Sequence, residues 1–229
     1  MQTIGLIGGL SWQSSIHYYR LLNEDVQRRL GGHHNARSVM VSVDFADAEA
    51  MMRAGDWDGL TRLLVDAAQR VEAAGADFVV LCTNTMHKLA GPLQDAIGIP
   101  LLNIIDAAAD AVRDAGLSRV ALLGTRFVMR EDFYVQRLAD GGIHALVPDP
   151  HGQADIDRII FEELTRGLIT DASRQAYLQV IERMQSLGAQ GVILGCTEIG
   201  LLLKQEDCVL PLFDTTEIHI RAAVDRALG

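Results

Sequence analysis

The amino-acid sequence predicts an α/β fold built from two similar lobes, each with a parallel sheet. Short apolar runs rich in Val, Ile and Leu alternate with longer amphipathic stretches, which is the pattern of buried parallel strands joined by crossover helices. An internal repeat predicts that this pattern is built twice. Because ligands bind beyond the carboxyl ends of the strands in open α/β sheets, two such lobes predict an active site in the cleft between them.

Eight apolar runs are expected to form the strands. In chain order they are Ile4–Ile7, Ser38–Val43, Phe78–Leu81, Pro100–Asn103, Val120–Leu123, His144–Val147, Val192–Leu194 and Pro211–Phe213. Helical periodicity fills most of the gaps between them. It is clearest at Gly59–Ala74 and Asp155–Arg166, where apolar residues recur every three or four positions.

The repeat consists of three pairs of similar segments, in the same order and at nearly the same offset along the chain. GADFVVLCT at Gly75–Thr83 matches GAQGVILGC at Gly188–Cys196, IGLIGG at Ile4–Gly9 matches VALLGT at Val120–Thr125, and PLLNIIDAAADAV at Pro100–Val112 matches PLFDTTEIHIRAAV at Pro211–Val224. One match could arise because all βα units look alike, whereas three ordered matches favour two lobes. We expect residues 1–97 with 209–229 to form lobe 1, and residues 98–208 to form lobe 2.

Composition narrows the class of protein. The 229 residues carry a net charge of −10, and 49% of them are hydrophobic. Phosphate binding needs basic charge concentrated on one face, so this balance argues against a nucleic-acid or membrane partner and favours a small-molecule enzyme or binding protein. No apolar run approaches the roughly 20 residues that span a bilayer, and we expect a cytoplasmic protein. Three cysteines without CxxC spacing predict free thiols.

A glycine-rich segment, GLIGGLSW, follows the first predicted strand. Its spacing is not the G-x-G-x-x-G of dinucleotide-binding folds and it lacks G-K-[ST], so it gives little support to nucleotide binding. Gly8, Gly9 and Ser11 fit a tight strand-to-helix turn whose backbone N–H groups could hold a carboxylate. A turn that binds no ligand fits the same residues.

Cys196 lies where an apolar strand passes into small polar residues and then into a helical pattern. The start of a helix lowers the pKa of a thiol, so this position predicts a reactive thiolate. Thr197 and Glu198 follow directly and could cap the helix or hold a substrate carboxyl group through backbone amides. The alternative is a buried structural cysteine.

The repeat also indicates which residue is equivalent to Cys196. Counted without gaps, Thr83 takes that position, and Cys82 would face the other way because side chains alternate along a strand. A gap at Gly195 would instead pair Cys82 with Cys196. We favour Thr83, and we expect Cys82 and Cys208 to serve packing.

The histidines show no metal-site spacing, so no metal is assigned. His33 and His34 lie in a glycine-containing loop and are expected in solvent. His87 follows Thr83 on a predicted helix and could orient a neighbour, whereas His219 is expected to be structural.

Over its whole length the chain resembles the cofactor-independent aspartate/glutamate racemase family. The resemblance rests on five segments taken in order: GLIGGLSW, CTNTMH, VALLGT, IIFEEL and GCTEIG. It implies two α/β lobes related by a pseudo-twofold axis, an amino-acid substrate, no cofactor, and usually a homodimer. It also implies two opposed bases, usually both cysteines, of which one takes the α-proton while the other delivers a proton to the opposite face.

Carried over to this chain, the second base falls on Cys196, in GCTE, and the first on Thr83, directly before Asn-Thr. This pairing resembles a subgroup of broad-specificity amino-acid racemases with a Thr/Cys pair. A hydroxyl is a much poorer base than a thiolate, so one direction is expected to be favoured or to need activation by neighbours. The residues expected to bind substrate are Leu10, Ser11, Met52, Asn84, Thr85, Thr125, Thr197 and Glu198.

Two of these positions bear on specificity. Leu10 and Met52 are apolar, and the basic side chains that some family members use for a second carboxylate have no clear match; Arg53 is the nearest candidate. This argues against strict specificity for acidic amino acids.

The sequence thus predicts an amino-acid racemase that does not use PLP, because it shows no PLP lysine motif. The developing enediolate must then be stabilised by hydrogen bonds to the substrate carboxylate. Two alternatives stay open. One is a single-cysteine decarboxylase or dicarboxylate cis–trans isomerase, and the other is a non-catalytic protein that binds a small acid.

Overall fold

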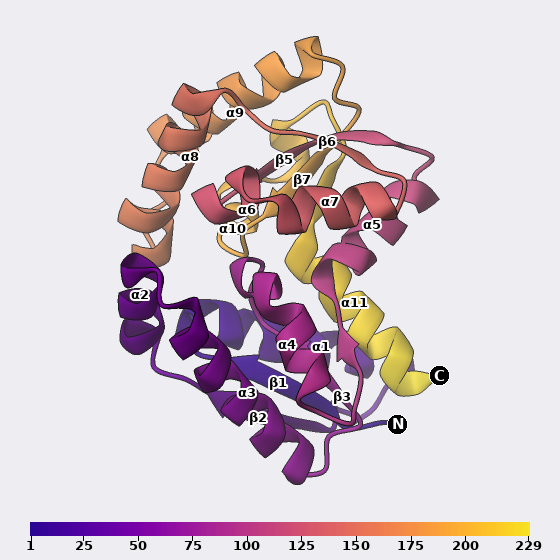
Figure 1. Cartoon of the computed structure of the whole chain (residues 1–229). Helices are drawn as coiled ribbons and strands as arrows, with labels where there is room; N and C mark the ends of the chain where they lie inside the picture. Colours follow the sequence, from indigo (N-terminus) through magenta and orange to yellow (C-terminus); the bar gives the residue numbers. More distant parts are fainter. The chain divides into compact units, whose positions relative to one another are not determined.

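The computed structural model describes residues 1–229, which form two compact units. Unit 1 comprises Met1–Asn103 and His219–Gly229, and unit 2 comprises Ile104–Ile218. The chain therefore leaves unit 1 once and returns to it for its last helix (Figure 1). Both termini lie in unit 1, where the Gln2 N–H donates to the Ala227 carbonyl at 2.8 Å.

Unit 1 contains a four-stranded parallel sheet in the order β2-β1-β3-β4. Its strands are β1 (Ile4–Gly8), β2 (Ser38–Ser42), β3 (Phe78–Leu81) and β4 (Leu101–Leu102). Its helices are α1 (Trp12–Leu30), α2 (Phe45–Ala54), α3 (Trp57–Ala73), the 3-10 helix η1 (Thr85–Leu89), α4 (Ala90–Asp95) and, from His219 onward, α11 (Thr215–Leu228).

Unit 2 repeats this arrangement with a four-stranded parallel sheet in the order β6-β5-β7-β8. Its strands are β5 (Arg119–Gly124), β6 (His144–Leu146), β7 (Val192–Gly195) and β8 (Leu212–Asp214). Its helices are α5 (Ile104–Asp114), α6 (Arg126–Arg130), α7 (Asp132–Asp140), α8 (Pro150–Glu162), η2 (Leu164–Arg166), α9 (Asp171–Ser186), α10 (Ile199–Leu202) and η3 (Gln205–Asp207).

The predicted α/β fold class and its repeat are confirmed by these two sheets. All eight predicted strands are present, and each observed end lies within one residue of its predicted position. Equivalent strands occupy equivalent places in the two sheets, and the pairing register agrees with the sequence repeat. Ile7 pairs with Leu81 in unit 1, and Leu123 pairs with Leu194 in unit 2.

The unit boundaries fall later than the lobe boundaries expected from the sequence, 1–97 with 209–229 and 98–208. Because β4 pairs with β3, the chain belongs to unit 1 as far as Asn103. Because β8 pairs with β7, it belongs to unit 2 as far as Ile218. Sheet pairing, rather than the start of each helical pattern, sets the division.

Two helices differ at their ends from the prediction. Helix α3 begins at Trp57 because the Asp56 side chain caps it, accepting the Gly59 N–H at 2.8 Å. Helix α8 begins at Pro150, after the capping residue Asp149, and ends at Glu162. The chain then makes the 3-10 turn η2, which Gly167 ends in the left-handed conformation at φ 74°.

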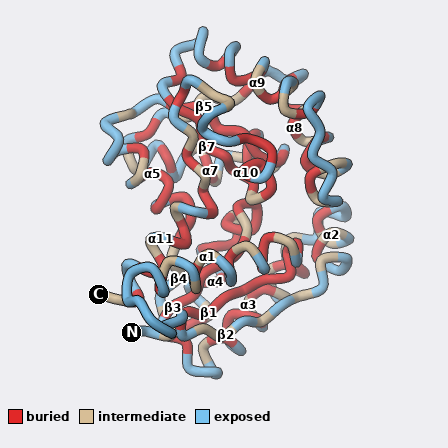
Figure 2. The backbone as a smooth tube through the Cα atoms, turned by 180° about the vertical axis from the view of Figure 1, so that it is seen from behind, coloured by how far each residue is buried: buried red, intermediate tan, exposed pale blue.

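The central strands β1, β3, β5 and β7 are almost wholly buried, whereas the edge strands are partly exposed (Figure 2). In unit 1 one core cluster joins β1 and β3 to α1 and α11, through residues such as Leu6, Val80, Leu22 and Val224. Unit 2 has a core cluster on each face of its sheet, since β5 contributes Ala121 and Leu123 to one and Val120 and Leu122 to the other. None of the helices combines the length and apolar character needed to cross a bilayer.

Candidate active site

The predicted site residues of unit 1 gather at one edge of its sheet. Leu10 and Ser11 follow β1, Thr83, Asn84 and Thr85 follow β3, and Met52 lies on α2, which follows β2. Strands β2, β1 and β3 are parallel neighbours, so their carboxyl ends share an edge. We call these six residues the unit 1 group.

The turn after β1 is tight and strained. Gly9 has φ +83°, and a Cβ at this position would overlap the backbone of Val43. Its N–H donates to Ser15 Oγ at 2.8 Å, so this amide serves the turn itself. Ser11, which caps α1, has φ 105° and is the one non-glycine residue with positive φ. Backbone strain of this kind costs about 1–3 kcal/mol and is concentrated at functional sites in proteins.

The structure separates Cys82 from Thr83. Cys82 is buried in the unit 1 core with Val80 and Tyr18, and burial raises the pKa of its thiol. Thr83 is only partly buried, and its N–H donates to the Leu81 carbonyl at 2.8 Å. The alternation of side chains along the strand therefore turns Cys82 toward the core, as expected.

Two buried histidines lie behind this strand end. His87 Nδ1 donates to the Thr83 carbonyl at 2.7 Å, so His87 orients the backbone of Thr83. His219 Nε2 donates to the Leu102 carbonyl at 2.9 Å, which leaves Nδ1 to accept from the Tyr18 hydroxyl at 2.9 Å. Burial lowers the pKa of His219 to about 4 and keeps this ring neutral. These bonds give His219 the structural role expected.

The side chains that bear on specificity in unit 1 are mostly apolar. Leu10 and Met52 are both buried. The side chain of Arg53 is 74% exposed and forms an ion pair with Glu49 at 2.6 Å. This pairing argues against a role for Arg53 in substrate binding. Lys88 Nζ lies 3.6 Å from the centre of the Trp57 ring, in a cation–π contact.

The predicted site residues of unit 2 occupy the corresponding edge. Thr125 follows β5, and Cys196, Thr197 and Glu198 follow β7; we call these four the unit 2 group. The last residues of the two strands, Gly124 and Gly195, are register partners. A Cβ on Gly124 would lie 2.7 Å from the Gly195 carbonyl oxygen, so glycine permits this close approach.

Cys196 is hydrogen-bonded to an acid two residues later. Its Sγ donates to Glu198 Oε2 at 3.1 Å, and Thr197 Oγ1 donates to the same oxygen at 2.6 Å. The pKa of the Cys196 thiol is raised well above its usual range. Burial is the largest cause, the Glu198 carboxylate is the next, and Asp157 adds to the rise. The expectation that a helix start would lower this pKa is wrong, because burial and the Glu198 carboxylate outweigh the effect of α10, which has only four residues.

Two residues near Cys196 were missed by sequence reasoning. Asp157, on α8, accepts the Arg126 N–H at 2.7 Å. Tyr177, on α9, is fully buried in the same core cluster as Cys196. Burial first, followed by the charges of Cys196, Asp157, Glu198 and Glu163, raises the pKa of Tyr177. No spacing signal marks either residue, because each lies on a helix that is distant from Cys196 in the sequence.

A partly buried acid, Asp214, supports the helical turn after Cys196. The Asp214 carboxylate packs against Gly200, where a Cβ would overlap it, and accepts the Thr216 N–H at 2.8 Å. Burial raises the pKa of Asp214 to about 6. No group of three or more His, Cys, Asp and Glu side chains is placed to hold a metal ion.

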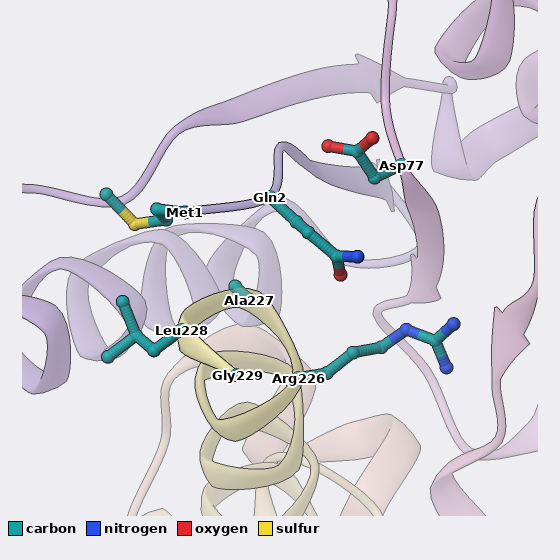
Figure 3. Close-up of a pocket in the computed structure, with 7 residues that line it drawn as sticks. All are labelled: Met1, Gln2, Asp77, Arg226, Ala227, Leu228 and Gly229. Carbon is teal, nitrogen blue, oxygen red and sulfur yellow. The ribbon is translucent and has the colours of Figure 1, made fainter.

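A surface pocket lies at the opposite edge of the unit 1 sheet (Figure 3). It is lined by Met1, Gln2, Asp77, Arg226, Ala227, Leu228 and Gly229. Gln2 precedes β1 and Asp77 precedes β3, so the pocket lies at the amino ends of these strands. Ligand sites in such sheets lie at the carboxyl ends, where the unit 1 group is found.

Taken together, the fold and these residues define an α/β protein of two repeated units that carries a thiol at one strand end and a hydroxyl at the equivalent strand end of the repeat. The family model for Asp/Glu/hydantoin racemase matches residues 7–223, and the chain belongs to this family.

Similar proteins agree with this assignment. The chain is 22% identical over 174 residues to the broad-specificity amino-acid racemase RacX of Bacillus subtilis, covering 76% of this chain and 75% of that protein. A crystal structure of a candidate Asp/Glu racemase from Yersinia pestis is 46% identical, with TM-score 0.94 and full coverage of both chains. An aspartate racemase homologue from Pyrococcus horikoshii is 33% identical, with TM-score 0.88 and full coverage of both. The protein is therefore an amino-acid racemase, which is an isomerase.

Proposed function

We propose that this racemase works without PLP and moves the α-proton of its substrate with Cys196 on one face of Cα and Thr83 on the other. The observation that carries the proposal is the 3.1 Å contact between Cys196 Sγ and Glu198 Oε2, because it gives the thiol proton a group to which it can pass. Cys82, by contrast, lies in the core with its Sγ 3.8 Å from the Val80 carbonyl.

The proton inventory starts from a protonated Cys196, since its surroundings raise the pKa of the thiol. The thiol proton passes to Glu198 Oε2, and the thiolate then accepts the α-proton. Thr83 Oγ1 delivers a proton to the opposite face of Cα, and the proton held by Glu198 returns to Thr83 through solvent. Because a hydroxyl and a thiol differ in acidity, the two directions run at different rates.

The intermediate is an enediolate, whose charge develops on the substrate carboxylate. Hydrogen-bond donors at both strand ends can stabilise it. The proposed donors are Ser11, Asn84 and Thr85 of the unit 1 group and, from the unit 2 group, Thr125 and the backbone N–H of Thr197, since the Thr197 hydroxyl already donates to Glu198. These residues follow neighbouring strands within their own sheets, so each sheet presents its donors at its carboxyl edge.

The substrate side chain is proposed to be variable and not restricted to acids. Leu10 and Met52 offer apolar surface, and Arg53, which follows Met52 in the sequence, is already paired with Glu49. A carboxylate side chain would therefore find no dedicated partner in the unit 1 group. The likeness to a broad-specificity racemase supports this assignment.

Independence from PLP is supported by the lysines, because a PLP enzyme needs a lysine amine for its Schiff base. The chain has two, Lys88 and Lys204. Lys88 lies against the Trp57 ring, and Lys204 Nζ donates to the Gly200 carbonyl at 2.5 Å.

The test is incubation of the purified protein with a panel of L-amino acids in D₂O, following α-deuteration and D-isomer formation. Wild type is expected to exchange and racemise at least one substrate. Cys196→Ala and Thr83→Ala are expected to lose at least 100-fold in rate, the order of magnitude of a removed acid or base. Cys82→Ala is the matched control and should keep activity. Loss of activity in Cys82→Ala with retention in Thr83→Ala would reject the pairing.

A single-thiol decarboxylase is the second candidate, because Cys82 is in the core and leaves Cys196 as the thiol with a carboxylate partner. Such an enzyme protonates one face of an enediolate formed by loss of CO₂ and needs no second base. Release of CO₂ from substituted malonates, without α-deuteration of amino acids, would establish this reaction in place of racemisation. Conversion of maleate to its trans isomer would identify the related isomerase.

We further propose a homodimer in the cytoplasm. An exposed apolar stripe on α1, formed by Trp12, Ile16 and Tyr19, is 62%, 56% and 51% exposed and lies on one face of the helix. Arg20 and Glu24 flank it with opposite charges, so two α1 helices packed antiparallel can pair them across a twofold axis. A reducing compartment would keep Cys196 as the free thiol that the reaction needs.

A further inference from the structure

Tyr177 carries a buried hydroxyl that contributes no hydrogen bond to the fold. The side chain is fully buried on α9, and its hydroxyl has no hydrogen-bond partner. Leaving a buried donor unpaired costs about 1–3 kcal/mol, and phenylalanine would fill the same space without that cost. Tyr18, the fully buried tyrosine of unit 1, shows the usual arrangement, because its hydroxyl bonds His219 Nδ1.

Four acidic groups act on this hydroxyl. Cys196, Asp157, Glu198 and Glu163 all raise the pKa of Tyr177, in that order, after the larger effect of burial. The hydroxyl therefore keeps its proton and can act only as a donor or as a neutral dipole. Tyr177 and Cys196 belong to the same core cluster of unit 2. Asp157 lies on α8, Glu163 follows that helix, and Glu198 lies in the turn after β7.

The three carboxylates already have donors. Asp157 accepts the Arg126 N–H, Glu198 accepts from Cys196 and Thr197, and Glu163 accepts from Ser173, one turn before Tyr177 on α9, and from Arg158. The Cys196 sulfur differs, because in its protonated form it donates to Glu198. Once that proton has left, the sulfur becomes an acceptor in need of donors, and the Glu198 backbone N–H is the one it has.

We propose that Tyr177 is a positioning residue for Cys196, donating a hydrogen bond to the sulfur when the thiol ionises. This rests on the proposed role of Cys196 as a base. In the structure the thiol donates to Glu198 and the Tyr177 hydroxyl has no hydrogen-bond partner, so the proposed bond forms when the hydroxyl turns toward the ionised sulfur. Tyr177 keeps its own proton throughout and forms no covalent bond. Its effect is to stabilise the thiolate in buried surroundings where Glu198 and Asp157 oppose that charge.

The experiment compares Tyr177→Phe with Tyr134→Phe. Both tyrosines are fully buried in unit 2, but Tyr134 belongs to the core cluster on the other face of the sheet. The rate of iodoacetamide alkylation of Cys196 is followed from pH 6 to 10 by mass spectrometry of its peptide, which reports the thiolate fraction without requiring turnover. Tyr177→Phe is expected to shift the alkylation profile to higher pH and to slow the neutral-pH rate about tenfold or more, since one pKa unit is a tenfold change in thiolate. Tyr134→Phe should leave the profile unchanged.

A second variant guards against a folding defect. Site-specific 3-fluorotyrosine at position 177 keeps the shape and gives a stronger donor, so alkylation should become faster at neutral pH. Unchanged alkylation profiles in both Tyr177 variants would overturn the proposal. If the profiles shift as expected while no variant or wild type exchanges α-protons, the hydrogen bond stands and the racemase mechanism fails, so the two failures are distinguishable.

Discussion

Glu198 has two opposed effects on Cys196. Its negative charge disfavours a second negative charge on the sulfur, while its Oε2 atom provides the place to which the thiol proton can go. The buried setting strengthens both effects. The thiol is thus held protonated until it is needed, which protects it from oxidation, a reaction of thiolates.

The first prediction separates these two effects with Glu198→Gln. The substitution removes the charge and the proton acceptor but keeps the size of the side chain. Alkylation of Cys196 at neutral pH is expected to become about tenfold faster, because the pKa of the thiol falls by about a unit. Deuterium exchange of the substrate is expected to become at least tenfold slower.

The control for this variant is Glu206→Gln, which removes an exposed carboxylate from η3 of the same unit. It should change neither rate. Slower alkylation in Glu198→Gln would show that the carboxylate activates the thiol instead of restraining it.

At the residue scale, sequence reasoning located Cys196 because strand-end residues in parallel sheets are confined to one edge. It also separated Cys82 from Thr83 by side-chain alternation. It failed on the pKa of Cys196 and on Asp157 and Tyr177 for one shared reason. Burial and charges contributed by α8 and α9 depend on tertiary packing, which no local spacing encodes.

Among the elements, the turn between β1 and α1 is the least tolerant of change. Gly9→Ala places a Cβ at φ +83° against the Val43 backbone, which cannot withdraw without breaking β2 from β1. We predict a loss of about 3 kcal/mol or more in the free energy of unfolding, from the left-handed conformation plus steric overlap. Urea denaturation measures it.

Gly91→Ala is the matched control for that variant. Gly91 lies in α4 with open space around its Cα, so alanine should be neutral or stabilise the protein by up to about 1 kcal/mol through helix propensity. An equal loss in both variants would mean that the Gly9 turn is not specially constrained.

The α1 stripe leads to a prediction about assembly. Ile16→Glu with Tyr19→Glu places two charges in the proposed dimer contact and should convert a dimer to a monomer, as measured by light scattering coupled to size exclusion. Leu187→Glu is the control. Leu187 is equally exposed, at 61%, but it follows α9 and is not part of the α1 stripe. A wild-type protein that is already a monomer would reject the proposed contact.

At the scale of elements, the strands were predictable because buried parallel strands are short continuous apolar runs bounded by polar residues. Helix ends were less predictable, since capping by Asp56 and Asp149 decided where α3 and α8 begin. The one-turn helices α6, η1 and α10 lack the length that reveals a periodic pattern.

For the whole molecule, we predict that acidification changes the stability of the two units in opposite directions. In unit 1, the pKa of His219 is lowered to about 4, so the unfolded state binds its proton first and stability falls as pH drops below about 6.5. In unit 2, the pKa of Asp214 is raised to about 6, so the folded state binds its proton first and stability rises as pH drops below 6. Between pH 7 and pH 5, the shift of His219 lowers the free energy of unfolding by about 2 kcal/mol. The shift of Asp214 raises it by about 1 kcal/mol.

Hydrogen exchange read by mass spectrometry, corrected for intrinsic exchange, resolves the two units. Amides of β1 and β3 should lose protection between pH 7 and 5, while those of β5 and β7 should gain it. Asp214→Asn should remove the gain in unit 2 alone. A parallel loss in both units, unaffected by that substitution, would contradict the assignment of these two groups.

The discontinuity of unit 1 has a consequence for synthesis on the ribosome. Its core around Leu6 and Val80 is completed by residues of α11 that emerge only after unit 2, namely Ile220, Ala223, Val224 and Ala227. Unit 2 is continuous and has all its strands as soon as its own segment is exposed. Unit 1 therefore exposes an apolar face on the ribosome while unit 2 is synthesised. At typical elongation rates this lasts on the order of ten seconds. Chaperone binding during translation should consequently map to the sheet of unit 1, which is synthesised before unit 2 and completed after it.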